Sequence, residues 1–293
     1  MQKIKLLTDT TSDIPAELAQ ELGIELKSIP LAVNGKSYLE GKDFTNQEFY
    51  ELLMRSTEIP ATSRINAIDF LESYCRAASE GVTDLIHVTI CAAGSGTYES
   101  ALTAQEMFRS KEPQLAAGMR IHLLDSRSYS FGYGHAVLEG ARLARGGAQA
   151  DEVISSITGW LDSTEIFLAC YSLDFAKKSG RIHSTAAFVG ELLGLRPIIH
   201  MVDGGNHILE KVRGDKNVVP AVCRLTKAAL AEGGTYYIMK GMLDEPAGEL
   251  QALLTEQIGY PPAGVYNLGA SVSINSGPKV IATVIQGKRR PQK

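Results

Sequence analysis

The fold is decided between residues 85 and 98, where the chain reads Leu85-Ile86-His87-Val88-Thr89-Ile90-Cys91-Ala92-Ala93-Gly94-Ser95-Gly96-Thr97-Tyr98. The first six residues form a short apolar run that predicts a buried strand. A helix is predicted from Tyr98 to Phe108, so a short loop with two glycines joins the two elements. A strand that leads directly into a helix is typical of a parallel sheet covered by helices.

The same alternation continues through the first half of the chain. An extended segment at 24–33 ends in Asn34-Gly35, a strong hairpin signal, and Thr45-Asn46-Gln47-Glu48 is a capping box that opens another helix. We therefore expect a Rossmann-like α/β domain with a parallel sheet at residues 1–158 and a hairpin insert near 28–42. The other predicted elements are strands at 4–7, 85–90 and 121–124 and helices at 15–22, 67–78, 98–108 and 137–144.

The second half predicts a different class of fold. Asp203-Gly204-Gly205-Asn206 separates two extended segments and indicates a β-hairpin. We expect an α+β domain with a mainly antiparallel sheet at residues 159–293. Its predicted helices are 150–161, which leads into it, 186–193, 218–230 and 249–258, and its predicted strands are 166–171, 197–202, 207–212, 236–239, 265–268, 271–274 and 280–285.

Composition excludes several classes of protein. Of the 293 residues, 44% are hydrophobic and 21% are charged, which disfavours a disordered chain or a coiled coil. Lys and Arg number 29 against 33 Asp and Glu, a net charge of −4, so a nucleic-acid partner is not expected. The chain shows neither a signal-peptide core nor an apolar run of membrane-spanning length, and its four cysteines are scattered. We expect a cytoplasmic protein whose basic residues 288–293 make at most transient contact with a membrane surface.

The loop around Ser95 is the first candidate site. In an open α/β sheet, ligands bind beyond the carboxyl ends of the strands. A helix that begins there offers free N–H donors and a partial positive charge, and Gly94 and Gly96 let the backbone approach a ligand closely. These features suit a phosphate or a carboxylate. The alternative is a tight turn that Ser95 or Thr97 caps.

Familiar catalytic motifs do not fit this loop. Ala93-Gly94-Ser95-Gly96-Thr97 lacks the glycines of a nucleophile elbow, and neither a Walker loop nor a dinucleotide fingerprint occurs. The six histidines show no metal-ligand spacing, so no metal and no cofactor are expected. Hydroxyl residues also follow other predicted strand ends, at 10–12, at Thr62-Ser63 and at Ser126. Each could be a helix cap, but together they favour the rim of a polar pocket.

Several motifs in chain order resemble the DegV family. They cover nearly the whole chain, which makes the set specific although each motif is weak. The matching stretches are Thr8-Asp9-Thr10-Thr11-Ser12-Asp13-Ile14-Pro15, Thr62-Ser63, Ser95-Gly96-Thr97-Tyr98 with Ser100-Ala101, Asp125-Ser126, Ser179-Gly180-Arg181-Ile182, Leu192-Leu193-Gly194-Leu195-Arg196-Pro197-Ile198-Ile199, Lys211-Val212-Arg213 and Ser276-Gly277-Pro278.

The resemblance implies a protein that binds one long-chain fatty acid and is not itself an enzyme. In this family the carboxylate lies at the domain junction, the tail lies in the C-terminal domain, and a separate fatty acid kinase subunit receives the lipid to make acyl phosphate for phospholipid synthesis. Carried over by residue, the carboxylate would meet Thr62, Ser63, Ser95, Gly96 and Asn275, with Arg181 near the head group and Arg213 at the kinase-docking surface. The tail would lie among Phe188, Leu192, Leu193, Leu195 and Ile198, in an apolar run that could otherwise be a core helix and strand.

The chain departs from the family pattern at three places. Thr-Ser-Gln-Pro of the family reads Thr62-Ser63-Arg64-Ile65, Lys-Pro reads Arg196-Pro197, and His-Thr-Gly-Pro reads Asn275-Ser276-Gly277-Pro278. Asn275 can donate a hydrogen bond but cannot carry a charge. This leaves two alternatives to a fatty-acid carrier. One is an enzyme acting on a phosphorylated or acyl substrate at the Ser95 loop, and the other is a sensor of a small polar ligand.

Overall fold

The computed structural model describes residues 2–58, 60–172, 175 and 194–288. The chain divides into two compact units, each considered below by itself. The expected domain boundary after residue 158 lies close to a division after Leu161, but two early segments also belong to the second unit. The first unit comprises Met1–Pro30, Leu39–Gly41 and Ser63–Leu161, and the second comprises Leu31–Tyr38, Lys42–Thr62 and Asp162–Lys293.

The first unit contains a four-stranded sheet in which every pairing is parallel, as predicted. All six residues of the strand predicted at 85–90 are buried, which is expected of an inner strand covered on both faces. The order is β2-β1-β6-β7, formed by β1 (Ile4–Asp9), β2 (Glu25–Lys27), β6 (Asp84–Thr89) and β7 (Arg120–Asp125).

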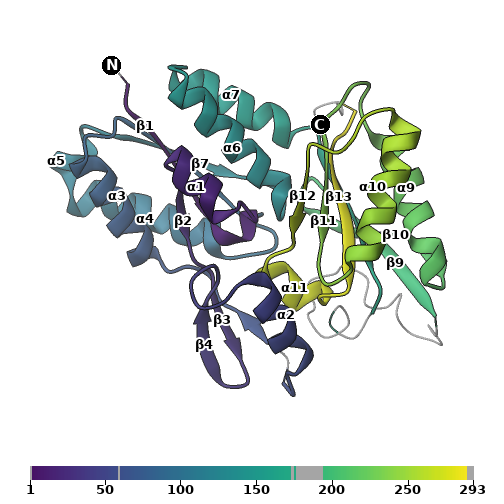
Figure 1. Ribbon diagram of the computed structural model, residues 1–293. Coiled ribbons are helices and arrows are strands. Elements are labelled where there is room, and N and C mark those ends of the chain that lie inside the picture. Colours follow the sequence, from purple (N-terminus) through teal and green to yellow (C-terminus); the bar gives the residue numbers. More distant parts are fainter. Residues whose placement is uncertain (1, 59, 173–174, 176–193, 289–293) are drawn as a thin grey trace. The chain divides into compact units, whose positions relative to one another are not determined.

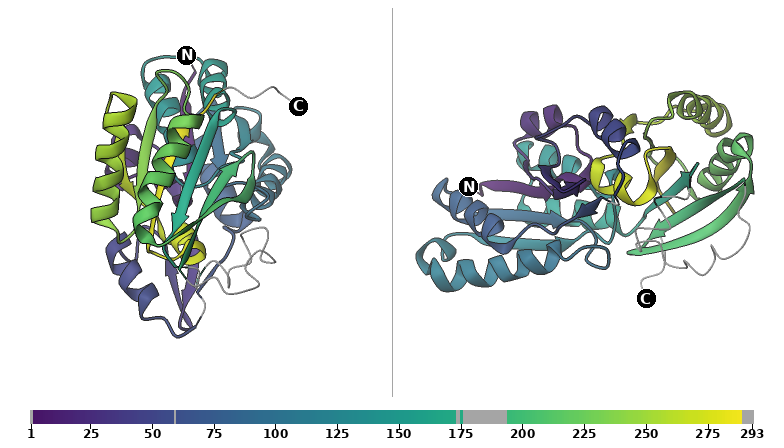
Figure 2. Two further views of the ribbon diagram at one scale, coloured as in Figure 1. Left: turned by 90° about the vertical axis from the view of Figure 1, so that its right-hand side faces the viewer. Right: turned by 90° about the horizontal axis from the view of Figure 1, so that it is seen from below.

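Helices cover both faces of this sheet (Figures 1 and 2). The helices α3 (Ala67–Ser79) and α4 (Thr97–Lys111) lie on one face, and α1 (Ala16–Leu22) and α6 (Phe131–Arg145) lie on the other. The remaining helices of the unit are η1 (Thr10–Ser12), α5 (Pro113–Ala116) and α7 (Ala150–Leu161), which packs on α6.

The helix α6 begins six residues before the predicted start at Val137. Gly132 and Gly134 are poor helix formers, so the sequence pattern places the start after them. A side chain at Gly134 would collide with the backbone carbonyl of Ser12, so glycine is needed for this close approach. The indole N–H of Trp160 on α7 then donates to the Gly132 carbonyl at 2.7 Å and ties the two helices together.

The second unit contains a small sheet with the order β4-β3-β5, formed by β3 (Pro30–Val33), β4 (Lys36–Leu39) and β5 (Ala61–Thr62). The predicted Asn34-Gly35 turn joins β3 to β4, with φ of 49° and 73° at the two residues. The predicted capping box is confirmed at the start of α2 (Asn46–Met54), where Thr45 and Glu48 each bond the backbone of the other.

A six-stranded sheet dominates the second unit, and it is antiparallel except where β11 pairs with β12. The predicted hairpin is present between β9 and β10, with φ of 49° at Asp203 and 77° at Gly204. The order is β10-β9-β8-β13-β11-β12, formed by β8 (Thr164–Cys170), β9 (Leu195–Val202), β10 (Gly205–Arg213), β11 (Tyr236–Lys240), β12 (Gly264–Asn267) and β13 (Val280–Gln286).

Two long helices, α9 (Val218–Ala229) and α10 (Asp244–Ile258), lie together on one face of this sheet (Figure 2). The short η3 (Asp215–Asn217) precedes α9, and Pro220 occupies the third position of α9, within the first turn, where proline is tolerated. Apolar residues of both helices form one core with Phe167, Ala169, Ile198, Tyr236, Ile238, Ile281 and Ile285 of the strands.

Two predicted strands are wrong. Residues 271–274, predicted as extended, form part of the helix α11 (Ala270–Ser276), and the segment predicted at 24–33 divides into β2 and β3, which belong to different sheets. The alternation Ser271-Val272-Ser273-Ile274 imitates a strand with one polar face. In the helix both kinds of residue are buried, so the alternation does not mark two faces of a strand. The helix predicted at 186–193 lies outside the described residues.

Candidate functional site

The carboxyl-end loops of the first sheet are tied to one another by a buried carboxylate, that of Asp9 at the end of β1. One of its oxygens accepts the N–H of Ile90 after β6 at 2.9 Å. The other accepts the N–H of Thr11 at 3.2 Å and the hydroxyl of Tyr133 on α6 at 2.6 Å. Burial raises the pKa of Asp9 to about 6, although these three donors act in the opposite direction.

A second carboxylate connects the loops after β6 and β7. Asp125 accepts the N–H of Ala92 at 2.9 Å and the N–H of Arg127 at 3.0 Å. The N–H of Cys91 donates to the Ser128 carbonyl at 3.1 Å. The sequence predicted that hydroxyl groups would gather at this edge, and the structure adds the carboxylates of Asp9 and Asp125, which hold the loops together.

The Ser95 loop leads from β6 into α4 as predicted. The N–H groups of Gly94 and Ser95 donate back to the Cys91 carbonyl at 3.0 and 3.1 Å, which makes the turn compact. Ser95 Oγ lies 2.9 Å from Thr97 Oγ1 and accepts the Thr97 N–H at 3.3 Å, so this hydroxyl does cap the turn. It remains half-buried and can still serve a ligand.

Free donors remain at the start of α4. Among the described residues, the N–H of Gly96 has no hydrogen-bond acceptor, and Gly96 itself provides no side-chain cap. A 15-residue helix that begins at such a point presents N–H groups and a partial positive charge. The loop can therefore hold an anion with Ser95 Oγ and backbone N–H groups.

Gly94 shapes the same loop from the other side. A methyl group at Gly94 would lie 2.5 Å from the hydroxyl of Tyr129, so only glycine lets this side chain lie against the backbone. Tyr129 comes from the loop after β7 and was not predicted as a site residue, nor was Tyr133. Tyr133 lies between two glycines of a helix, a position typical of a packing residue, so no sequence pattern indicates its hydrogen bond to Asp9.

The predicted residues Thr62 and Ser63 stand on either side of the division between the units. In the first unit, the N–H of Ser63 donates to the Pro30 carbonyl at 2.9 Å, so only its hydroxyl is available to a ligand. In the second unit, Thr62 lies in β5 and pairs with Leu31 of β3. The half-buried hydroxyl of Thr62 has no partner among the described residues.

Asn275 lies near the end of α11, which contacts both α2 and β5 in the second unit. Its side-chain nitrogen donates to the Ser271 carbonyl one turn earlier at 2.8 Å, which leaves one amide hydrogen and the amide oxygen. Gly277 follows with φ of 79°, and a methyl group there would lie 2.9 Å from the ring of Phe175. Both the conformation and the contact require glycine at this position.

The six-stranded sheet has a second apolar face opposite α9 and α10. Because side chains alternate along a strand, neighbours of the residues in the helix-covered core point the other way. These outward-pointing residues lie side by side across four strands; for example, Leu168 pairs with both Ile199 and Ala282. This second face consists of Ile166, Leu168, Cys170, Ile199, Met239, Val280, Ala282 and Val284, each at most 2% exposed.

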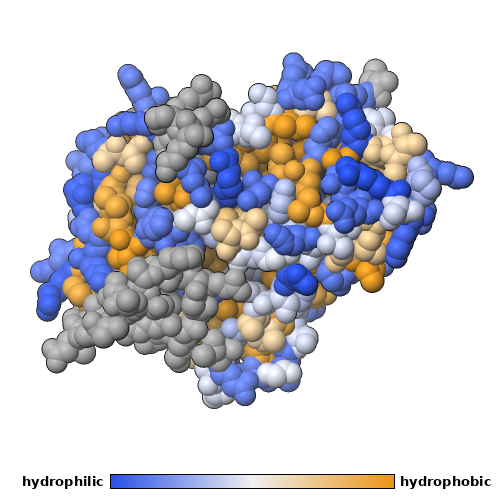
Figure 3. Space-filling model, turned by 180° about the vertical axis from the view of Figure 1, so that it is seen from behind, coloured by the Kyte–Doolittle hydropathy of each residue, from blue (hydrophilic) through white to orange (hydrophobic). Residues whose placement is uncertain are grey.

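The predicted tail residues divide between these two faces. Ile198 is completely buried in the core beneath α9 and α10, whereas Leu195, which is half-buried, lies on the side of Ile199. Figure 3 shows apolar side chains gathered on part of the back of the second unit. Arg181, Phe188, Leu192 and Leu193 lie outside the described residues.

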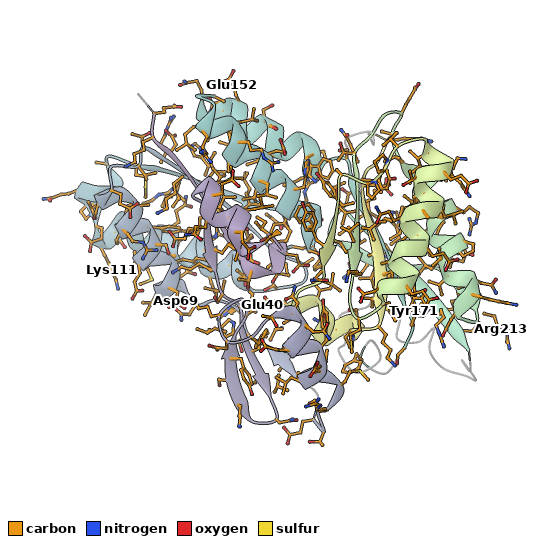
Figure 4. The ribbon with its side chains drawn as sticks, in the orientation of Figure 1. Glu40, Asp69, Lys111, Glu152, Tyr171 and Arg213 are labelled. Carbon is orange, nitrogen blue, oxygen red and sulfur yellow. The ribbon has the colours of Figure 1, made fainter. Side chains whose placement is uncertain are left out.

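Arg213 ends β10, where it pairs with Leu195 of β9. Its side chain is exposed and points outward at the edge of the second unit (Figure 4). The nearby Arg196 is held in an ion pair with Asp215, at 2.6 Å between Nε and Oδ1. Arg213 is therefore presented at the surface, as a docking residue would need to be.

The described part of the chain contains neither a metal-binding cluster nor a membrane-spanning helix. Between residues 2 and 288, apart from the gaps given above, no group of three or more His, Cys, Asp or Glu side chains is arranged to hold a metal ion. Within the same ranges, no helix has both the length and the apolar character that crossing a bilayer requires.

Comparison with known proteins identifies the family. A family model described as an uncharacterised protein of the DegV family matches residues 3–288. The chain belongs to the DegV family. A DegV domain-containing protein of Caldanaerobacter subterraneus is 28% identical over 293 residues, covering 98% of this chain and all of the relative. Another from Clostridium acetobutylicum is 30% identical over 76% of each chain.

Solved DegV structures share this fold. A structure described as fatty acid binding of a DegV family protein from Thermus thermophilus is 25% identical, covers 98% of this chain and 100% of its own, and has a TM-score of 0.85. A stearic acid-binding protein from Eubacterium ventriosum is 22% identical, covers 98% of each chain and has a TM-score of 0.86. The predicted fold class and the DegV resemblance are both confirmed.

Proposed function

We propose that this DegV protein binds one long-chain fatty acid and acts as a carrier rather than an enzyme. The observation that supports the proposal is the start of α4, where Ser95 Oγ and the free Gly96 N–H provide donors suited to a carboxylate. The related Thermus thermophilus protein is described as binding fatty acid, which supports the same ligand here.

The head group is assigned to neutral donors, and the structure supports this for Ser95, Gly96 and the Ser63 hydroxyl of the first unit. Thr62 and Asn275, which lie in the second unit, belong to the proposal through the family resemblance. Hydrogen bonds to a charged group contribute roughly 1.5–3 kcal/mol each, enough to orient a carboxylate. Arg181 belongs to the proposal through the family resemblance alone.

The tail is assigned to the second unit. Each buried CH₂ group contributes about 0.8 kcal/mol, so a long acyl chain supplies most of the affinity. The second face of the six-stranded sheet offers apolar side chains without a charged group, and Leu195 lies on that side. Phe188, Leu192 and Leu193 extend this assignment to the adjoining sequence, whereas Ile198 is better explained as packing beneath α9 and α10.

The carrier would deliver its lipid to a separate fatty acid kinase subunit in the cytoplasm. Arg213 is proposed as a docking residue because it is exposed, on a strand edge and without a described ion-pair partner. A carrier role is favoured over catalysis because, within the described ranges, Ser95 Oγ contacts Thr97 and no histidine or lysine base.

The Ser95→Ala variant tests the carboxylate site. We expect its affinity for palmitate to fall roughly tenfold, because one hydrogen bond to a charged group is lost. Titration of lipid-free protein measures this directly. Ser110→Ala removes a hydroxyl from the far end of α4 and should leave the affinity unchanged. Equal affinities in all three proteins would show that Ser95 only caps the turn.

A further inference from the structure

Arg64 is a charged residue beside the Ser95 loop whose role neither the fold nor the residues assigned above explain. A methyl group at Gly96 would lie 3.0 Å from Arg64 Cδ and 3.4 Å from Arg64 Nη1, so the arginine side chain crosses the loop at this glycine. The guanidinium therefore lies beside Gly96, whose N–H is free, and both residues belong to the first unit.

The backbone on either side of Arg64 is fixed. The N–H of Ser63 donates to the Pro30 carbonyl at 2.9 Å, and Ile65 is only 2% exposed. The Arg64 side chain itself is exposed, and among the described residues it has neither an acidic partner nor a hydrogen bond. The packing of the neighbouring residues therefore positions the Arg64 backbone, while the guanidinium remains free to bind a ligand.

This position is electrostatically unfavourable without a ligand. The N-terminus of α4 carries a partial positive charge, and a cation near such an end is destabilising. Glu99 lies in the first turn of α4, but among the described residues no carboxylate forms an ion pair with the Arg64 guanidinium. A ligand anion at the Ser95 loop would offset both charges and could accept two parallel N–H bonds from the guanidinium.

We propose that Arg64 binds the ionised head group and makes the site select acids over neutral lipids of the same length. This inference rests on the proposed fatty-acid function. The described residues assigned to the head group above are all uncharged, and Arg181 lies outside the described residues. Arg64 therefore supplies, within the described structure, a positive charge that distinguishes a carboxylate from an alcohol or an ester. Neutral hydroxyl and amide donors could bind either kind of head group.

A comparison of two ligands in two proteins tests the proposal. Wild-type protein and Arg64→Gln are titrated with dodecanoate and with 1-dodecanol, which have the same chain length and differ in charge. We expect the variant to bind dodecanoate roughly tenfold more weakly and dodecanol about as well as wild type. Arg64→Lys should recover part of the loss, and Arg109→Gln, at the far end of α4, should change neither affinity.

Each other outcome overturns a specific statement. Unchanged affinity of Arg64→Gln for dodecanoate overturns the role of Arg64 while fatty-acid binding stands. An equal loss of affinity for both ligands shows that Arg64 supports the structure of the loop and does not distinguish a charged head group from a neutral one. This result also overturns the proposal. If wild-type protein binds neither these ligands nor palmitate, the proposed function itself fails, and this result is distinguishable from the other two.

Discussion

Polar groups are buried at one edge of the first unit's sheet, whereas the second unit's sheet carries apolar side chains on both faces. Around Asp9, a carboxylate and several hydroxyls are enclosed, and Thr8, Thr11, Ser12 and Thr89 have buried hydroxyls without a partner among the described residues. Across β8 and β13, Leu168 and Ala282 are buried on one side and Phe167 and Ile281 on the other. The first arrangement suits recognition of a head group, and the second suits burial of a hydrocarbon chain.

An amphiphile has a polar head group and an apolar tail. The comparison shows that one chain can provide a polar region suited to the first and an apolar region suited to the second. Burying unpaired polar groups costs stability, so a site of that kind is retained where it serves a ligand. A sheet with two apolar faces does not lose stability through unpaired polar groups, but both faces must be kept from water. The first region should therefore respond to charge and pH, and the second to side-chain volume.

The largest effect is expected on the second face. Leu168→Ala should lower the free energy of unfolding by about 2–5 kcal/mol through lost burial and the cavity left behind. Ile281→Ala, on the helix-covered face, should cost a similar amount. Only the Leu168 variant should also change which acyl chain is preferred, shifting binding toward longer chains in a competition among fatty acids read by mass spectrometry. Identical chain-length profiles would mean that the second face is only a packing surface.

The next largest effect is on the pH dependence of stability and arises from Asp9, the buried carboxyl group of the first unit. Because burial raises the pKa of Asp9 from 3.8 to about 6, the folded chain holds this proton more tightly than the unfolded chain. Its stabilising contribution is full below about pH 4 and is lost as the pH rises through about 6, which amounts to as much as about 3 kcal/mol.

The Asp9→Asn variant isolates this titration. At about pH 4 the variant should be less stable than wild type, and the difference in unfolding free energy should shrink as the pH is raised to about 7. Denaturant unfolding of both proteins at several pH values measures it, and other carboxylates cancel in the difference. A difference that does not change with pH would show that Asp9 titrates normally.

The smallest effect is expected at the start of α2. Thr45→Ala removes the side chain that caps this helix and should cost about 1 kcal/mol of stability. Thr57→Ala, an exposed threonine later in the same segment, should cost little. Urea unfolding distinguishes the two. Equal stabilities would mean that the contacts of α2 within the second unit, rather than its cap, hold the helix.

Local chemistry explains which parts of this structure the sequence predicts. The strand, loop and helix around Ser95 were predicted closely because an apolar run, two glycines and a helix-favouring segment agree with one another. The Thr45–Glu48 capping box and the two hairpin turns were predicted because each depends on residues only a few positions apart.

Long-range contacts explain what was missed. The segment that contains α2 belongs to the second unit, where the Tyr50 hydroxyl donates to the carbonyl of Leu268, and no local pattern indicates a partner so distant in sequence. The helix α11 was mistaken for a strand because its serines are buried, with Ser276 Oγ bonded to the Val272 carbonyl at 3.2 Å. The position of Arg64 across Gly96 also depends on folding, since the two residues lie 32 positions apart in the sequence.

The most direct test of the account is native mass spectrometry of the protein purified without added lipid. We predict a population carrying one long-chain fatty acid per chain, which added palmitate or oleate replaces and which the Ser95→Ala variant retains less well. Protein that is recovered empty and takes up neither palmitate nor oleate would contradict the assignment of this DegV protein as a fatty-acid carrier.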